Sequence, residues 1–147
     1  MTEKDIKMKE HALGEADIAD IHALFLRQAA AETAHDIAGM EDVLAHAVAG
    51  EPDPVNFVAR AYRFWGREAV LGHFRAVFAG TWRFEPEVDQ IRVLPLNADT
   101  AHIYAPALIT IGPADLGETT YRFLVNEIAV RTPHGWRIAS IVPVPVQ

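Results

Sequence analysis

Several residue types that carry common chemistries are missing or scarce in this sequence of 147 residues. Cysteine is absent, which excludes disulfide bonds and every reaction that needs a thiolate. The lysines lie within the first nine residues, ahead of any expected core, which argues against a Schiff-base or phosphate-loop lysine. The single serine, Ser140, lies in an Ile-Ala-Ser-Ile stretch rather than in a glycine-flanked elbow. Catalysis by a thiolate, a buried lysine or a serine nucleophile is therefore not expected.

Long apolar runs and basic clusters are also missing. No run approaches the ~18 apolar residues that a membrane span requires, and the charged start lacks the apolar segment of a signal peptide. Asp and Glu outnumber Lys and Arg by 20 to 13, the formal net charge is −7, and the arginines are dispersed. These features predict a cytoplasmic protein with neither a membrane nor a nucleic acid as partner.

Cofactor and metal motifs are absent as well. The glycines are too far apart to form the G-x-G-x-x-G motif of a dinucleotide site. Seven histidines are present, but they form no H-x-H, H-x-x-H or H-E-x-x-H spacing. We therefore expect neither a metal site nor a cofactor.

The hydropathy pattern divides the chain into a helical first part and a strand-rich second part. Residues 1–14 are polar and are expected to form a flexible arm, and residues 15–147 a single domain. Helical spacing predicts helices from an N-cap at Asp17 to Ala34, from an N-cap at Asp36 to about Ala47, and from Gly66 to Gly80. Strands are predicted over 55–58, 62–65, 83–96, 100–111, 119–132 and 135–145. This order indicates an α+β fold in which three helices cover one face of a curved sheet of about six strands.

Four short motifs, together with the order of the elements, resemble the SnoaL-like families. The motifs are Ala34-His35-Asp36, Val55-Asn56-Phe57-Val58, Trp65-Gly66-Arg67-Glu68-Ala69-Val70 and Gly135-Trp136-Arg137-Ile138-Ala139. These families belong to the nuclear transport factor two-like (cystatin-like, ketosteroid isomerase-like) superfamily, and the most similar pattern is that of the SgcJ/EcaC-type proteins. The resemblance covers about residues 17–145. It implies a cone of mixed or antiparallel sheet, a small-molecule pocket between the first helix and the inner sheet face, and a homodimer through the outer sheet face.

The resemblance also implies positions for a proton-transfer site. Ketosteroid isomerase-like enzymes use a carboxylate base on the first strand and hydrogen-bond donors from the first helix and a late strand. In this chain the donor positions fall near Gln28 and Asn126, and the base position falls near Asn56-Phe57, where no carboxylate is present. The chain also has Val142-Pro143-Val144-Pro145 where SgcJ-like chains commonly carry a histidine before a final Thr-Pro.

Glu32 is the candidate catalytic residue. It lies on the same helical stripe as Ile21, Phe25 and Ala29, so its carboxylate is expected to face the cone. Burial would raise its pKa and suit it to act as a general acid or base. The alternative is that Glu32 tilts to solvent or pairs with an arginine. Gln28 lies one turn earlier and could donate its amide to a ligand carbonyl.

The remaining candidates are polar residues that could line the pocket. Asn126 alternates with Leu124 and Ile128 and is expected to face inward with them. The other predicted ligand-binding residues are Asn56 on the first strand, His73 beside the apolar stripe of the third helix, and His102 and Tyr104 on one strand face. Each could equally be a polar residue satisfied by neighbouring groups.

Two functions remain open at this point. The first is a domain that binds a small, mostly apolar molecule and isomerises, cyclises or dehydrates it without a cofactor. In this hypothesis Glu32 moves the proton, and Gln28 and Asn126 stabilise the oxyanion. The second is a non-enzymatic homodimerisation or binding module whose cone is plugged by aromatic side chains.

Overall fold

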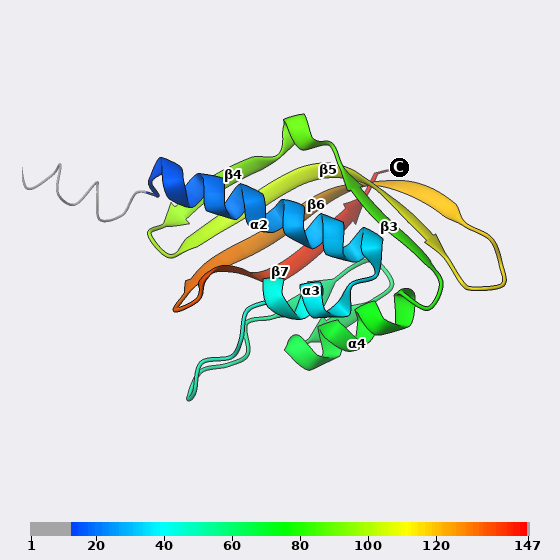
Figure 1. Ribbon diagram of the computed structural model, residues 1–147, viewed down its shortest axis with the longest axis horizontal. Coiled ribbons are helices and arrows are strands. Elements are labelled where there is room, and N and C mark those ends of the chain that lie inside the picture. Colours follow the sequence, from blue (N-terminus) through cyan, green and yellow to red (C-terminus); the bar gives the residue numbers. More distant parts are fainter. Residues whose placement is uncertain (1–12, 147) are drawn as a thin grey trace, which may run out of the picture.

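A strongly curved sheet of seven strands forms the framework of the computed structural model, which describes residues 13–146 (Figure 1). The strands are β1 (Asn56–Val58), β2 (Arg63–Trp65), β3 (Thr81–Pro86), β4 (Arg92–Asn97), β5 (Thr100–Gly112), β6 (Thr119–Thr132) and β7 (Gly135–Pro145). Their order is β2-β1-β7-β6-β5-β3, and β4 also pairs with β5. The β1–β7 pair is parallel and the other pairs are antiparallel. Residues 1–12 of the predicted arm lie outside the described part of the chain.

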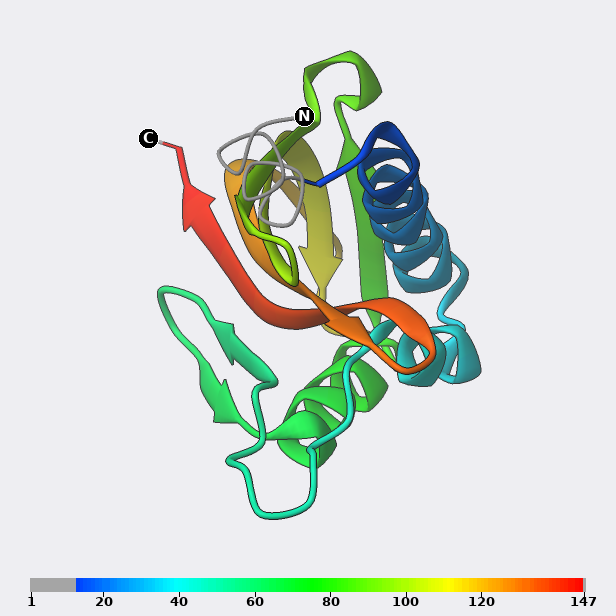
Figure 2. The same cartoon turned by 90° about the vertical axis from the view of Figure 1, so that its left-hand side faces the viewer.

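Three helices pack against this sheet and complete the cone. They are α2 (Glu15–Ala34), α3 (Ile37–Val43) and α4 (Arg67–Val77). Figure 2 shows α2 beside β3 along the curved sheet, with α3 and α4 at one end of it. The core lies between α2 and the inner sheet face, to which β5 contributes three buried alanines: Ala101, Ala105 and Ala107. The predicted α+β cone is confirmed.

The predicted strand over 83–96 is two strands, which accounts for the seventh strand. A short 3₁₀ turn at Val88–Gln90 separates β3 from β4. The two strands then pair with different parts of β5, because β3 lies beside 107–112 and β4 lies beside 100–104. The break therefore separates the residues that pair with the end of β5 from those that pair with its beginning.

The second helix ends earlier than predicted, at Val43 rather than near Ala47. Leu44 is extended and forms a parallel bridge with Ile138, and the Ala45 amide donates to the Ile138 carbonyl at 2.8 Å. Pairing with β7 thus competes successfully with continuation of the helix. The predicted N-cap of this helix is confirmed, because Asp36 accepts a hydrogen bond from the Gly39 amide at 3.0 Å.

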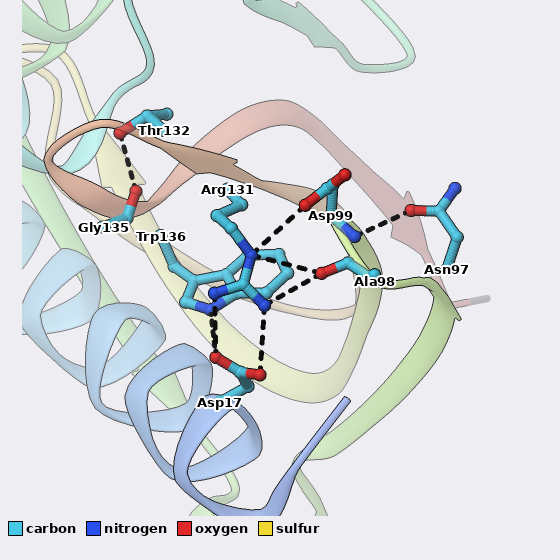
Figure 3. Close-up of polar contacts among 8 residues, drawn as sticks. All are labelled: Asp17, Asn97, Ala98, Asp99, Arg131, Thr132, Gly135 and Trp136. Atoms are coloured by element: carbon cyan, nitrogen blue, oxygen red, sulfur yellow. Dashed lines mark hydrogen bonds and ion pairs between the residues drawn. The ribbon is translucent and has the colours of Figure 1, made fainter. Parts of the chain in front are cut away.

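Asp17 does not cap α2, and this prediction was wrong. The N-cap is Gly14, and Asp17 lies inside the first turn of α2. Its carboxylate instead accepts two hydrogen bonds from Arg131, at 3.1 and 3.0 Å, and one from the Trp136 indole at 3.1 Å (Figure 3). The Arg131 guanidinium lies 4.7 Å from the Trp136 ring centroid and donates to the Ala98 carbonyl. These contacts of Asp17, Arg131 and Trp136 connect the start of α2 to the β4–β5 turn and the β6–β7 hairpin.

Of the helices that the structure describes, none is long and apolar enough to cross a membrane.

Candidate functional site

Two glutamates meet inside the core on either side of one glutamine. Gln28 and Glu32 lie one turn apart on the buried face of α2, and Glu127 faces them from β6. The Gln28 amide nitrogen donates to Glu32 Oε2 at 2.8 Å and to Glu127 Oε2 at 2.9 Å. The three side chains are at most 2% exposed. One amide therefore bridges two buried carboxyl groups.

Trp82 completes this arrangement, which we call the interior cluster: Gln28, Glu32, Trp82 and Glu127. The Trp82 indole, on β3, donates to Glu32 Oε1 at 3.0 Å. Glu32 thus accepts two hydrogen bonds, whereas Glu127 accepts one. Among residues 13–146, Gln28 Oε1 and Glu127 Oε1 are buried atoms without a hydrogen-bond partner. The cluster therefore retains unsatisfied polar atoms, which are uncommon in protein interiors.

Burial dominates the electrostatics of the two glutamates. Desolvation raises the pKa of Glu32 from 4.5 to about 7, and the hydrogen bonds from Gln28 and Trp82 oppose that rise. Desolvation also raises the pKa of Glu127 well above its usual value, and the neighbouring Glu32 charge raises it further. When one of the two carboxyl groups ionises, the negative charge is therefore more stable on Glu32, which accepts two hydrogen bonds, than on Glu127, which accepts one.

This division gives the two groups different chemical abilities at neutral pH. A carboxyl group that titrates near 7 can accept or return a proton under physiological conditions. A carboxyl group that stays protonated can donate a hydrogen bond to a developing oxyanion. The cluster therefore contains the parts of an acid–base pair.

In the interior, the structure brings together two of the residues that the sequence singled out. Gln28 and Glu32 are adjacent, and Glu32 faces the interior rather than solvent. Asn126 does not join them, and the prediction that it faces inward is corrected. Its neighbour Glu127 occupies the interior, and Asn126 lies half-buried on the outer sheet face.

The wrong prediction of which β6 residues face the interior has a simple cause. Successive strand residues face opposite sides, and both faces of β6 are apolar around this point. The inner set is Val125, Glu127 and Ala129, which is as regular as the outer set of Leu124, Asn126 and Ile128. Sequence reasoning therefore missed Glu127, although its alternation with Val125 and Ala129 was a visible signal.

His102 and Tyr104 also lie on the outer face rather than at the mouth of the interior. The ring Nε2 of His102 is 2.9 Å from Asn126 Oδ1, and Tyr104 is the β5 residue paired with Asn126. His102 and Asn126 line a shallow hollow that also includes Ser140. The side chains of these residues leave the opposite face of the sheet from that of Glu127.

The first-strand position expected for a base holds no interior carboxyl group. Asn56 accepts a hydrogen bond from the Ser140 hydroxyl of β7 at 2.8 Å, and its neighbour Phe57 is the buried residue. Asn56 therefore acts as a link between β1 and β7 in this structure.

His73 is buried on α4 among aromatic rings. Its ring centroid lies 4.6 Å from Phe57, 4.8 Å from Phe64 and 6.0 Å from Trp82. Burial lowers the pKa of His73 from 6.5 to about 4, so the imidazole is neutral at physiological pH. Trp82 thus contacts both His73 and Glu32, so His73 lies directly beside the interior cluster.

Residues 13–146 contain no group of three His, Asp or Glu side chains placed to hold a metal ion. The prediction of a protein that uses no metal or cofactor stays a prediction.

Comparison with known proteins identifies a matching family and solved structures that share the fold. The profile of the SnoaL-like domain family matches residues 21–143. No curated protein matches the sequence significantly.

Solved structures with low sequence identity share the fold. One is a protein from Streptomyces avermitilis, described as a candidate dehydratase of the NTF2-like family, with 20% identity and a TM-score of 0.76; the match covers 90% of this chain and 97% of that one. A protein from Novosphingobium aromaticivorans, described as a candidate aromatic ring hydroxylase, has 18% identity and a TM-score of 0.77, with coverages of 91% and 92%. An uncharacterised protein from Caulobacter vibrioides with a cystatin-like fold has 14% identity and a TM-score of 0.71, with coverages of 90% and 91%. At these identities the likeness establishes the fold, the NTF2-like cone, and no activity.

Proposed function

The chain belongs to the SnoaL-like domain family, and we propose that it binds a small, mostly apolar molecule in its cone and moves a proton on it without a cofactor. The observation that carries this proposal is the pair of buried carboxyl groups bridged by Gln28. Burying two such groups is costly unless each is neutral or well bonded, so a pair of this kind is more often found where its proton chemistry is used.

In this proposal Glu32 is the residue that exchanges a proton with the ligand. Its two hydrogen-bond donors stabilise the carboxylate enough to let it ionise near neutral pH despite its burial. Glu127, whose pKa burial raises well above its usual value, takes in its protonated form the donor role that the resemblance placed at Asn126. The supported reaction class is isomerisation, cyclisation or dehydration next to a carbonyl group.

A second function is favoured by a different observation. Gln28, Glu32 and Glu127 are at most 2% exposed, so the interior cluster is closely packed in this conformation. Such packing suits a non-enzymatic binding or dimerisation module with a plugged cone.

The same module has a surface that would support self-association. Apolar side chains are exposed on the outer sheet face: Leu94, Leu96, Leu108 and Val144. Exposed apolar side chains on a sheet face are typical of a homodimer contact. We propose that the protein is a homodimer through this face, with or without catalysis. Sedimentation of Leu96→Lys tests this contact: it is expected to be monomeric where the unchanged protein is dimeric, and equal sedimentation would count against the proposal.

Proton exchange on a named ketone tests the catalytic version. In D₂O, the protein is expected to accelerate deuterium incorporation next to the carbonyl of 2-tetralone, with a rate that rises through about pH 7 as Glu32 ionises. Glu32→Gln should reduce this rate by about 100-fold or more. Glu15→Gln, an exposed change on the same helix, should leave it unchanged. No acceleration on a panel of cyclic ketones, together with no ligand-induced rise in melting temperature, would favour the non-enzymatic module.

A further inference from the structure

A groove of about 640 Å³ runs along α4. The aromatic residues Tyr62 and Phe64 of the β1–β2 hairpin form one wall. The end of β5, from Ile111 to the following turn, forms another, and α4 itself forms the floor. The described residues that line the groove include no charged side chain. Its size falls in the range of pockets that bind small organic molecules.

Small residues of α4 keep this groove open. Ala69, Gly72 and Ala76 follow one another at spacings of three and four, so they share one face of the helix. A Cβ atom at Gly72 would meet no atom within 4 Å, and the backbone there has no positive φ. Neither close packing nor backbone conformation therefore requires glycine, although glycine destabilises a helix interior. Glycine at position 72 therefore leaves the floor of the groove open.

His73 supplies a polar group with an unfilled hydrogen bond beside this floor. The residue lines the groove, is 6% exposed, and its Nε2 is a buried atom without a partner in the described part of the chain. A buried nitrogen left in this state destabilises the protein, and a ligand group that bonds it would remove that cost. Because the imidazole is neutral, it has one N–H donor and one acceptor nitrogen.

We propose that the α4 groove binds an uncharged aromatic or alicyclic molecule that carries one hydroxyl group, and that His73 bonds this hydroxyl. A hydroxyl both donates and accepts, so it suits a neutral imidazole in either tautomer. A charged ligand would lose its hydration without meeting an opposite charge in the lining. The ring of Tyr62, 52% exposed, and the ring of Phe64 offer flat apolar surfaces for stacking. The inference goes beyond the proposed proton chemistry, because it holds whether or not Glu32 acts on the ligand.

Titration with three naphthalene probes, followed by NMR at pH 7, tests this proposal. We expect 2-naphthol to shift the signals of Gly72, His73 and Ala76, and to bind at least about ten-fold more tightly than the anion 2-naphthoate. It should also bind about five-fold more tightly than 2-methylnaphthalene, which lacks the hydroxyl. Equal affinity for the three probes, or shifts centred elsewhere, would overturn the assignment.

Two variants of one glycine locate the binding site. Gly72→Leu should fill the groove and weaken 2-naphthol binding at least ten-fold, whereas Gly72→Ala, whose Cβ would meet no atom within 4 Å, should stay within about three-fold. His73→Phe should bring the affinity for 2-naphthol down to that for 2-methylnaphthalene. Unchanged binding by Gly72→Leu, or a change in its sedimentation that reveals a second copy in the groove, would overturn the proposal. Glu32→Gln should bind 2-naphthol normally, so a failure of the proton chemistry is distinguishable from a failure of this site.

Discussion

The buried carboxyl pair predicts an unusual dependence of stability on pH. Most carboxylates stabilise the folded state when ionised, so stability is lost toward acid. Here the sign is reversed, because burial raises the pKa of Glu32 from 4.5 to about 7. Between these values the folded protein holds a proton that the unfolded chain has released. The stabilisation is therefore fully present below about pH 4.5 and is lost as pH rises through 7.

The magnitude follows from the same two pKa values. A difference from 4.5 to about 7, at about 1.4 kcal/mol for each pH unit, corresponds to roughly 3 kcal/mol of unfolding free energy. Glu127 acts in the same direction, because its pKa is also raised by burial and by the Glu32 charge. A loss of this size is a large part of the stability of an ordinary domain.

Urea unfolding between pH 5 and 9, followed by tryptophan fluorescence, measures this effect. The unfolding free energy should fall by about 1.4 kcal/mol per pH unit for each group that is protonated in the folded protein and ionised in the unfolded chain, so the slope should exceed this value where Glu32 and Glu127 both contribute. Glu32→Gln should flatten the curve by roughly 3 kcal/mol, and it should also lower the pKa of Glu127, because the Glu32 charge is one cause of that raised value. Glu15→Gln is the matched control, and its curve should follow that of the unchanged protein. Stability that rises or stays level over this range, or a parallel curve for Glu32→Gln, would refute the reasoning.

Three further predictions concern local structure, each measured by urea unfolding at pH 6. Gly39→Ala should destabilise by about 1–2 kcal/mol, because the added Cβ would lie 2.8 Å from Asp36 Oδ2 and displace the cap of α3; an unchanged midpoint would show that the cap tolerates it. Gly72→Ala should stabilise by about 0.5–1 kcal/mol, because the new methyl group meets open space in the middle of a helix; a loss of stability would contradict this account. Asp17→Asn should destabilise by about 1 kcal/mol, because it removes the charge paired with Arg131, and high salt should shrink the difference; the same difference at all salt concentrations would argue against an ionic origin.

Local patterns predicted much of the fold. The last two strands have the bounds expected from their composition and from the turns between them, Thr119–Thr132 and Gly135–Pro145. The cap at Asp36 likewise acts within its own turn. Asp17 shows the limit of such reasoning. The residue type suits a cap, but Arg131, which is 114 positions away, is its actual partner.

Half of the candidate site could be predicted for the same reason. Gln28 and Glu32 face the interior because helical periodicity places them on the apolar stripe of α2. The interior position of Glu127 could not be predicted in this way, because a strand with apolar residues on both faces does not reveal which face is the inner one.

The amino-acid sequence by itself determined the class of elements, most of their bounds and the burial of Glu32, since these depend on neighbours within one or two turns of the chain. Tertiary structure alone decided that Glu127 meets Glu32 across Gln28, that β3 and β4 separate, and that His73 lies beside an open groove. Each of these depends on contacts between segments that are distant in the chain. Their outcome depends on strand pairing, facing and packing of the whole cone, which no local pattern encodes.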